Sequence, residues 1–313
     1  MENYNKEPLT IDKQIELLEG RGVKISDKKY LTKFLLGVNY YKFTAYLKSY
    51  ELAKDSFDCE VEKAIKLYEF DRTLRIKIFE ALSVIEIIFK TQIAYHIGIK
   101  YGKFGHYDLN NFKERHKNWL SEISKSLHKE KRDSGGNIIS IFFKEIFLKY
   151  YKNKYSDYPK IPIWMFVELI SFGEASKLFS NMKFNDQVKI AKYFISDKIL
   201  DPQFSRSLFH IFSVTRNICA HNGRLWNKEF NLRFPKCGIE NTEFAEYDLE
   251  PIKTGKLFLL INYILMRTYF DVNFIYLWRN DVEQIVDSHP EVKDFWNRFG
   301  LPENWKEHPL WKR

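Results

Sequence analysis

A short polar string close to residue 220 contains three side chains that could together cleave a phosphodiester bond: Arg216, Asn217 and His221. An imidazole can take the proton from an RNA 2′-hydroxyl or give one to the departing 5′-oxygen. A guanidinium matches two phosphate oxygens and stabilises the extra charge of the transition state, while a carboxamide can orient either group. This chemistry needs no metal ion, and its products are a 2′,3′-cyclic phosphate and a 5′-hydroxyl.

The spacing of these residues predicts that they lie on one side of a helix over 205–221. At about 100° per residue, His210, Ser213, Asn217 and His221 form a polar stripe, with Arg216 beside it. The opposite side collects the apolar residues Leu208, Ile211, Phe212, Thr215, Ile218 and Cys219. Cys219 is therefore interpreted as a structural thiol and not as a nucleophile. The Asn222-Gly223 pair is typical of a helix end, which places His221 at the C-terminus of the helix.

One helix of this kind cannot close a tight site by itself, because Arg216 and His221 diverge by about 140° around its axis. A second copy packed against the same face in a two-fold dimer would bring two arginines and two imidazoles into one cleft. The sequence therefore predicts a homodimer with a composite site.

Several residues around the string are predicted to bind RNA. Arg224 could hold a phosphate and Trp226 could stack on a base, with Asn222 and Asn227 offering hydrogen bonds. An equally good interpretation is that this segment anchors the post-motif loop to the core. His210 could contact RNA or have a structural role. The basic segment 113–132 could bind an RNA partner, although interleaved glutamates favour a solvated face.

Long stretches with helical period and few glycines or prolines, 13 and 9 among 313 residues, predict an all-α fold. We expect helices at 10–19, 28–49, 62–99, 164–181, 185–194, 205–221 and 254–269. These divide the chain into an N-terminal helical arm over 1–60, a central helical domain over 61–275 and a C-terminal extension over 276–313. Four tryptophans in the extension indicate that it packs on the core: Trp278, Trp296, Trp305 and Trp311.

The string is also similar to a known motif. Arg216-Asn217, three residues and His221 resemble the R-x(4-6)-H signature of the HEPN superfamily, and RNICAHNGRLWN resembles the motif of bacterial abortive-infection proteins of the AbiD/AbiF type. Other matches run over about 8–275, at Pro8-Leu9-Thr10, Asn39-Tyr40-Tyr41-Lys42, Phe70-Asp71-Arg72, Leu74-Arg75, Pro162-Ile163-Trp164, Glu168 and Phe172-Gly173.

The resemblance implies a HEPN-like helical bundle that acts as a homodimeric, metal-independent ribonuclease toxin in phage defence. It implies that Arg216, Asn217 and His221 are catalytic, and that a small non-coding RNA restrains the protein as an antitoxin in some systems. Many relatives have a second histidine after the motif histidine, where this chain has Asn222.

Composition fits this interpretation. The net charge of +9 favours polyanions, and no metal, cofactor, DNA or membrane partner is expected. Cys59, Cys219 and Cys237 form no disulfide or zinc pattern, and the N-terminus has no apolar leader, so we expect a cytoplasmic location. Two functions remain open: an endoribonuclease that cuts single-stranded RNA, or a non-catalytic RNA-binding or protein-interaction module of the same fold.

Overall fold

The computed structural model describes residues 7–127, 143–195, 202–230, 252–301 and 303–312. The all-α prediction is confirmed, because nearly every element in these ranges is a helix. The described strands form two small pairs: β1 (Val23–Lys24) with β4 (Cys59–Glu60), and β2 (Glu51–Ala53) with β3 (Ser56–Phe57). In the described ranges, none of the helices combines the length and the apolar character that crossing a membrane requires.

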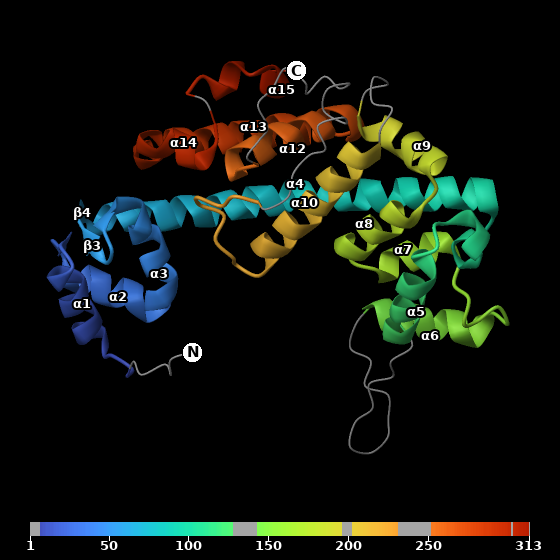
Figure 1. Ribbon diagram of the computed structural model, residues 1–313, viewed down its shortest axis with the longest axis horizontal. Helices are drawn as coiled ribbons and strands as arrows, with labels where there is room; N and C mark the ends of the chain where they lie inside the picture. The colour runs from blue at the N-terminus through green and yellow to red at the C-terminus, as the bar shows by residue number, and fades with distance from the viewer. Residues whose placement is uncertain (1–6, 128–142, 196–201, 231–251, 302, 313) are drawn as a thin grey trace.

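A single long helix, α4 (Val61–Tyr101), runs through the whole molecule and carries the other elements (Figure 1). Its 41 residues span about 60 Å at the usual helical rise. The helix forms because large apolar residues recur every three or four positions, and all of these are fully buried: Leu74, Ile78, Leu82, Ile85, Phe89 and Ile93. Gly102, with a φ of 80°, ends it. The predicted helix at 62–99 is confirmed.

The N-terminal arm packs against the beginning of α4 and consists of α1 (Ile11–Gly20), α2 (Lys28–Gly37) and α3 (Tyr40–Leu47). Thr10 caps α1, because its hydroxyl accepts a hydrogen bond from the Lys13 backbone N–H at 3.4 Å. The prediction of one helix over 28–49 was wrong. Asn39 interrupts it, since its side-chain oxygen accepts from the Tyr41 N–H at 2.9 Å and starts a new helix.

The other end of α4 is surrounded by shorter helices, namely α5 (His116–Leu127), α6 (Phe143–Lys154), α7 (Ile163–Leu169), α8 (Phe172–Asn181) and α9 (Phe184–Phe194). The prediction of one helix over 164–181 was wrong, because Ser171 and Glu174 form a capping box that begins α8. The basic segment at 113–132 is described only to residue 127, and its last cations, Lys129, Lys131 and Arg132, lie outside the described residues.

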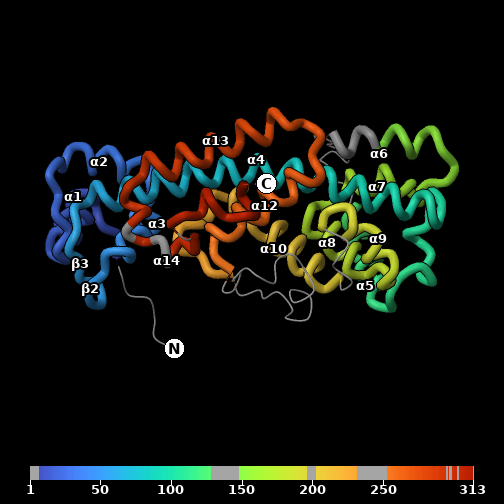
Figure 2. Tube along the Cα trace, turned by 90° about the horizontal axis from the view of Figure 1, so that it is seen from above, coloured from blue at the N-terminus to red at the C-terminus, as the bar shows by residue number. Residues whose placement is uncertain are grey.

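The remaining helices cover the middle of α4 (Figure 2). They are α10 (Pro202–Ala220), α12 (Thr254–Thr268), α13 (Val272–Asp287), α14 (Trp296–Phe299) and α15 (Pro309–Lys312). Short 3-10 turns lie at Lys48–Tyr50, Gly105–Tyr107, Leu109–Asn111, Pro290–Phe295 and Trp305–Glu307.

The C-terminal segment packs on the core. Trp278, Trp305 and Trp311 are almost fully buried, and the Asn262 side-chain amide donates to the Leu310 carbonyl at 2.7 Å. The boundary expected between the central domain and the extension, after residue 275, falls inside α13. The chain therefore continues across it as one helix.

Candidate active site

Arg216 and Asn217 lie on α10, and His221 follows its last residue; α10 crosses α4 obliquely at the centre of the molecule (Figure 1). The apolar side of α10 faces α4 and α8, where the Phe209 ring stacks on Phe89 with centroids 3.9 Å apart. Leu208, Ile211, Phe212 and Thr215 are fully buried, as the sequence predicts. This packing fixes the rotation of the helix, so that the opposite side faces outward.

The polar stripe on α10 is exposed but narrower than predicted. His210, Asn217 and His221 are exposed. Ser213 is not, because only 2% of it is accessible and its hydroxyl donates to the His210 carbonyl at 2.8 Å. The exposed stripe therefore consists of two motif residues one turn apart, with His210 further back along the helix.

The helix ends immediately after the motif in a Schellman turn. The Gly223 N–H donates to the Ile218 carbonyl at 2.7 Å, and the Asn222 N–H donates to the Cys219 carbonyl at 3.1 Å. Asn222 adopts a φ of 54°, in the left-handed region where asparagine is tolerated. A Cβ at position 223 would lie 2.9 Å from Ile218 Cγ2, so the turn requires glycine there. His221 is thus the C-cap residue, which confirms its predicted position.

Arg216 is half-buried and is held from three sides. Its Nε lies 3.1 Å from Glu86 Oε2 of α4, and its guanidinium lies over the Phe79 ring at 5.7 Å from the centroid. Its Nη1 donates to Asn217 Oδ1 at 3.2 Å. The Nε–H is not aligned on the Glu86 oxygen, so this contact is an ion pair and not a hydrogen bond. Glu86 is itself buried and pairs with the buried Lys90 at 2.7 Å.

The loop after the motif is anchored to the core. Trp226 is fully buried, stacks on Phe299 and donates its Nε1–H to Ser49 Oγ at 2.8 Å. The prediction that Trp226 stacks on an RNA base was wrong, because the ring is not accessible. Arg224 is exposed, but its Nη1 donates to the Ala45 carbonyl at 2.6 Å. Asn227 is exposed, with a φ of 52°.

A buried carboxylate, Asp71 of α4, organises this anchoring. It accepts hydrogen bonds from the Trp226 backbone N–H at 2.7 Å, from the Leu225 N–H at 3.1 Å and from the Tyr46 hydroxyl at 2.6 Å. Arg75, one turn along α4, completes the set as an ion-pair partner. Burial and the adjacent Asp71 charge raise the pKa of Tyr46, so its hydroxyl stays protonated and remains a donor. The loop and the N-terminal arm therefore meet on one carboxylate.

A lysine of the N-terminal arm reaches the end of the motif helix. Lys42 Nζ donates to the Asn222 carbonyl at 2.7 Å. Burial, and then the charge of Arg75, lower the pKa of Lys42. This contact places a cation of α3 beside the C-terminus of α10, next to His221 in the chain.

Sequence reasoning assigned no role to Glu86, Asp71 or Lys42. Asp71 and Lys42 both lie in sequence segments that resemble the abortive-infection proteins. This resemblance was the one sequence feature that could have pointed to them. Glu86 gave none, because a glutamate four residues before a lysine is typical of a solvated helix surface.

The arrangement supplies a guanidinium, a carboxamide and an imidazole at one accessible helix end. Cys219 cannot add a nucleophile, because burial raises the pKa of its thiol to about 12. Among the residues that the structure describes, no group of three or more His, Cys, Asp and Glu side chains could hold a metal ion.

Comparison with known proteins gives one match. The family model for Abi-like proteins matches residues 33–227, which is more than half of the chain and includes α4, α10 and the anchored loop. No curated protein and no solved structure matched. The chain therefore belongs to the Abi-like protein family, which supports a role in abortive infection, a form of phage defence.

Proposed function

We propose that this Abi-like protein is an endoribonuclease toxin of the HEPN superfamily, of the AbiD/AbiF type, which cuts single-stranded RNA without a metal ion. The observation that carries the proposal is the grouping of Arg216 with the exposed Asn217 and His221 at one helix end. Arg216 supplies positive charge for a phosphate, and His221 supplies an imidazole that solvent can reach.

The reaction balances with the residues named. A base removes the proton of the RNA 2′-hydroxyl, the 2′-oxygen attacks the phosphorus, and the bond from phosphorus to the 5′-oxygen breaks. An acid then protonates the 5′-oxygen. The products are a 2′,3′-cyclic phosphate and a 5′-hydroxyl. Arg216 stabilises the added negative charge on the phosphate oxygens as the new bond forms.

Two proton-transfer groups are needed, and each protomer contributes one motif histidine. We therefore propose a two-fold homodimer in which the α10 surfaces face each other, so that one His221 is the base and the other is the acid. A small non-coding RNA could restrain the toxin by occupying the same surface. The cytoplasm, where both RNAs are found, is the proposed location.

His221→Ala tests the proposal. RNA cleavage should collapse by ~10² to 10⁴-fold, the range for loss of a proton-transfer group, while RNA affinity changes little. His210→Ala, which removes an exposed imidazole further back along the same helix, should reduce cleavage much less than His221→Ala, because His210 is given no proton-transfer role. Wild-type cleavage should persist in EDTA. Unchanged cleavage in His221→Ala would leave the non-catalytic RNA-binding module as the better account, and loss of cleavage in EDTA would disprove the metal-independent mechanism.

Co-expression of wild-type and His221→Ala chains tests the composite site. If one cleft needs His221 from both protomers, the mixed dimer is inactive, so cleavage should fall with the square of the wild-type fraction. A fall in direct proportion to the wild-type fraction would show that the protomers act independently.

A further inference from the structure

Two hollows lie side by side on the far half of α4, away from the motif. The first, of about 380 Å³, lies between α4 and α7. The second, of about 540 Å³, lies between α4 and α9. Both are lined by Tyr95 and Ile99, so these two residues form the boundary that the hollows share.

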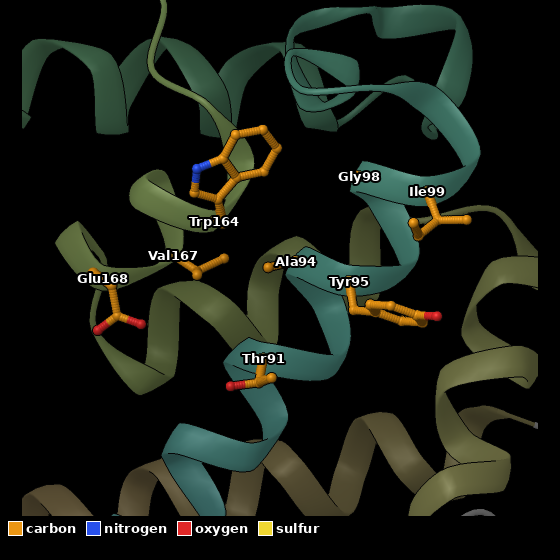
Figure 3. Close-up of a pocket in the computed structure, with 8 residues that line it drawn as sticks. All are labelled: Thr91, Ala94, Tyr95, Gly98, Ile99, Trp164, Val167 and Glu168. Carbon is orange, nitrogen blue, oxygen red and sulfur yellow. The ribbon is translucent and has the colours of Figure 1, made fainter.

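The first hollow is lined mainly by apolar and aromatic residues, together with Thr91 and Glu168. Figure 3 shows Trp164, Val167 and Glu168 on α7 and Ala94, Tyr95 and Ile99 on α4, with Tyr95 on the side away from Trp164. Trp164 is 54% exposed and Tyr95 is 66% exposed, whereas the other tryptophans whose side chains the structure describes are buried. These rings are accessible surfaces on which a flat group can stack.

The second hollow is basic. Lys100, Lys189, Lys192 and His96 line it, together with the buried Asp186. Asp186 accepts from His96 Nε2 at 2.8 Å and from the Tyr101 hydroxyl at 2.8 Å, and it also pairs with Lys100. Burial raises the pKa of Asp186, but the hydrogen bonds from Lys100, His96 and Tyr101 outweigh this effect and lower it. The charge of Lys100 thus compensates the carboxylate, and Lys189 and Lys192 are two further cationic side chains in the lining of this hollow.

An exposed face of α4 connects these hollows with the candidate active site. Ile87, Thr91, Tyr95 and Ile99 recur every four residues and are all exposed, so they follow one side of the helix. Glu86, which pairs with Arg216, lies nine residues before Tyr95, or about 14 Å along the axis. A strand of a few nucleotides can cover that distance.

We propose that the two hollows form a second binding site for single-stranded RNA, in which a base stacks on Trp164 or Tyr95 and the backbone phosphates lie against Lys189 and Lys192. Adjacent aromatic and basic surfaces are the combination that single-stranded nucleic acids recognise. This inference depends on the proposed function in one respect, namely that the bound strand is RNA. It would hold the RNA beyond the cleaved bond and so increase affinity without taking part in the reaction.

The test measures binding of a short labelled single-stranded RNA of mixed sequence to the full-length His221→Ala chain, which should not cut the probe. Adding Lys189→Glu and Lys192→Glu should weaken binding at least tenfold and flatten the log-log salt dependence by roughly 1.4, since each lost phosphate contact removes ~0.7. The matched control, Lys29→Glu with Lys33→Glu on α2, makes the same change in net charge away from the hollows and should weaken binding much less.

The aromatic contribution is tested separately. Trp164→Ala should weaken binding roughly fivefold or more, the usual loss for one base stacked on an aromatic ring, and Trp164→Phe should restore most of it. Ultraviolet crosslinking of bound RNA should label the peptides that contain Tyr95 and Trp164.

Equal affinities for the Lys189/Lys192 and Lys29/Lys33 variants would overturn the inference, as would a wild-type chain that binds no single-stranded RNA. A change in oligomeric state in Trp164→Ala without a change in RNA affinity would assign this surface to a protein contact instead. These binding measurements do not depend on cleavage by the wild-type chain. RNA binding at the hollows can therefore be confirmed even if the nuclease proposal is wrong, and it can be disproved even if that proposal is right.

Discussion

Arg216 Nε lies 3.1 Å from Glu86 Oε2, so the guanidinium of the candidate site is held by a buried carboxylate of the scaffold helix. The pair joins α10 to α4 across 130 residues of sequence. It has two effects that oppose each other. It fixes the direction of the guanidinium, which favours a preorganised site, and it competes with any phosphate for the same charge.

Glu86→Gln separates these effects. The substitution keeps the shape of the side chain but removes its charge, so Arg216 loses its fixed direction, and we expect kcat for RNA cleavage to fall more than KM rises. It also leaves the buried Lys90 without its partner, which should cost several kcal/mol of unfolding free energy, on the order of 3–5 kcal/mol. Steady-state cleavage kinetics and urea unfolding measure the two losses.

The double variant Glu86→Gln with Lys90→Met provides the control. It removes the uncompensated lysine and should recover most of the stability without recovering kcat. Full recovery of kcat in the stabilised double variant would show that Glu86 has only a structural role.

Substitution of Asp71 is expected to lower the free energy of unfolding strongly, although Asp71 has no proposed role in RNA cleavage. Asp71→Asn takes the counter-charge from the buried Arg75, and removing one partner of a buried pair typically costs about 3–5 kcal/mol. Asp58→Asn is the matched control, because the pair of Asp58 with Lys24 is exposed to solvent and contributes little to stability. Urea unfolding should show the difference. Similar losses in the two variants would mean that the Asp71 hydrogen bonds do not hold the loop.

The sequence predicted α4 and α10 well because both are long and strongly periodic. Their apolar residues recur often enough that the helix, its buried side and its end at His221 follow from spacing alone. The two failures at 28–49 and 164–181 have a common cause. Asn39 and Ser171 each start a new helix through a side-chain hydrogen bond, and the apolar pattern continues across both breaks without a glycine or proline to mark them.

Contacts between distant segments could not be predicted in the same way. Trp226 follows the motif directly, and nothing in the local sequence separates a ring that stacks on RNA from one that packs on Phe299. Glu86 and Lys42 reach the motif from other helices, so their contacts depend on how α4 and α3 are placed in space. Residue type suggests a chemistry for the candidate site, but only the tertiary structure identifies the residues that hold Arg216 and the motif loop in place.

Substitutions of Asn222, at the end of α10, are expected to change the stability of the protein in a defined order. Its φ of 54° costs most side chains about 1–2 kcal/mol, whereas glycine adopts it freely. Asn222→Gly should therefore change the melting temperature little, and Asn222→Ala should lower stability by about 1 kcal/mol. Asn222→His keeps a residue type that tolerates this conformation and restores the second histidine of many relatives. An Asn222→Ala chain as stable as Asn222→Gly would contradict the left-handed turn.

Two buried histidines near the far end of α4 predict acid sensitivity. His106 is fully buried, neither ring nitrogen has a hydrogen-bond partner among the described residues, and burial lowers its pKa to about 3. Burial also lowers the pKa of His116, whose Nε2 lies 2.8 Å from the His106 carbonyl. In the unfolded chain both histidines return to a pKa near ~6.5. The unfolded state therefore binds more protons below that pH, and the stability present at neutral pH is lost as the pH falls.

The expected slope between about pH 6 and pH 4 is up to ~1.4 kcal/mol per pH unit for His106, because unfolding then takes up one proton at this group. His116 adds to the loss in the same direction. His106→Phe fills the same space with a ring that does not titrate, so its urea midpoint should fall less steeply with acid than that of the wild type. His289→Phe serves as the control, because His289 is less buried and its ring nitrogen already has the Ile285 carbonyl at 2.8 Å. If His106→Phe and the wild type lose stability in parallel over this range, His106 is not the group that takes up the proton.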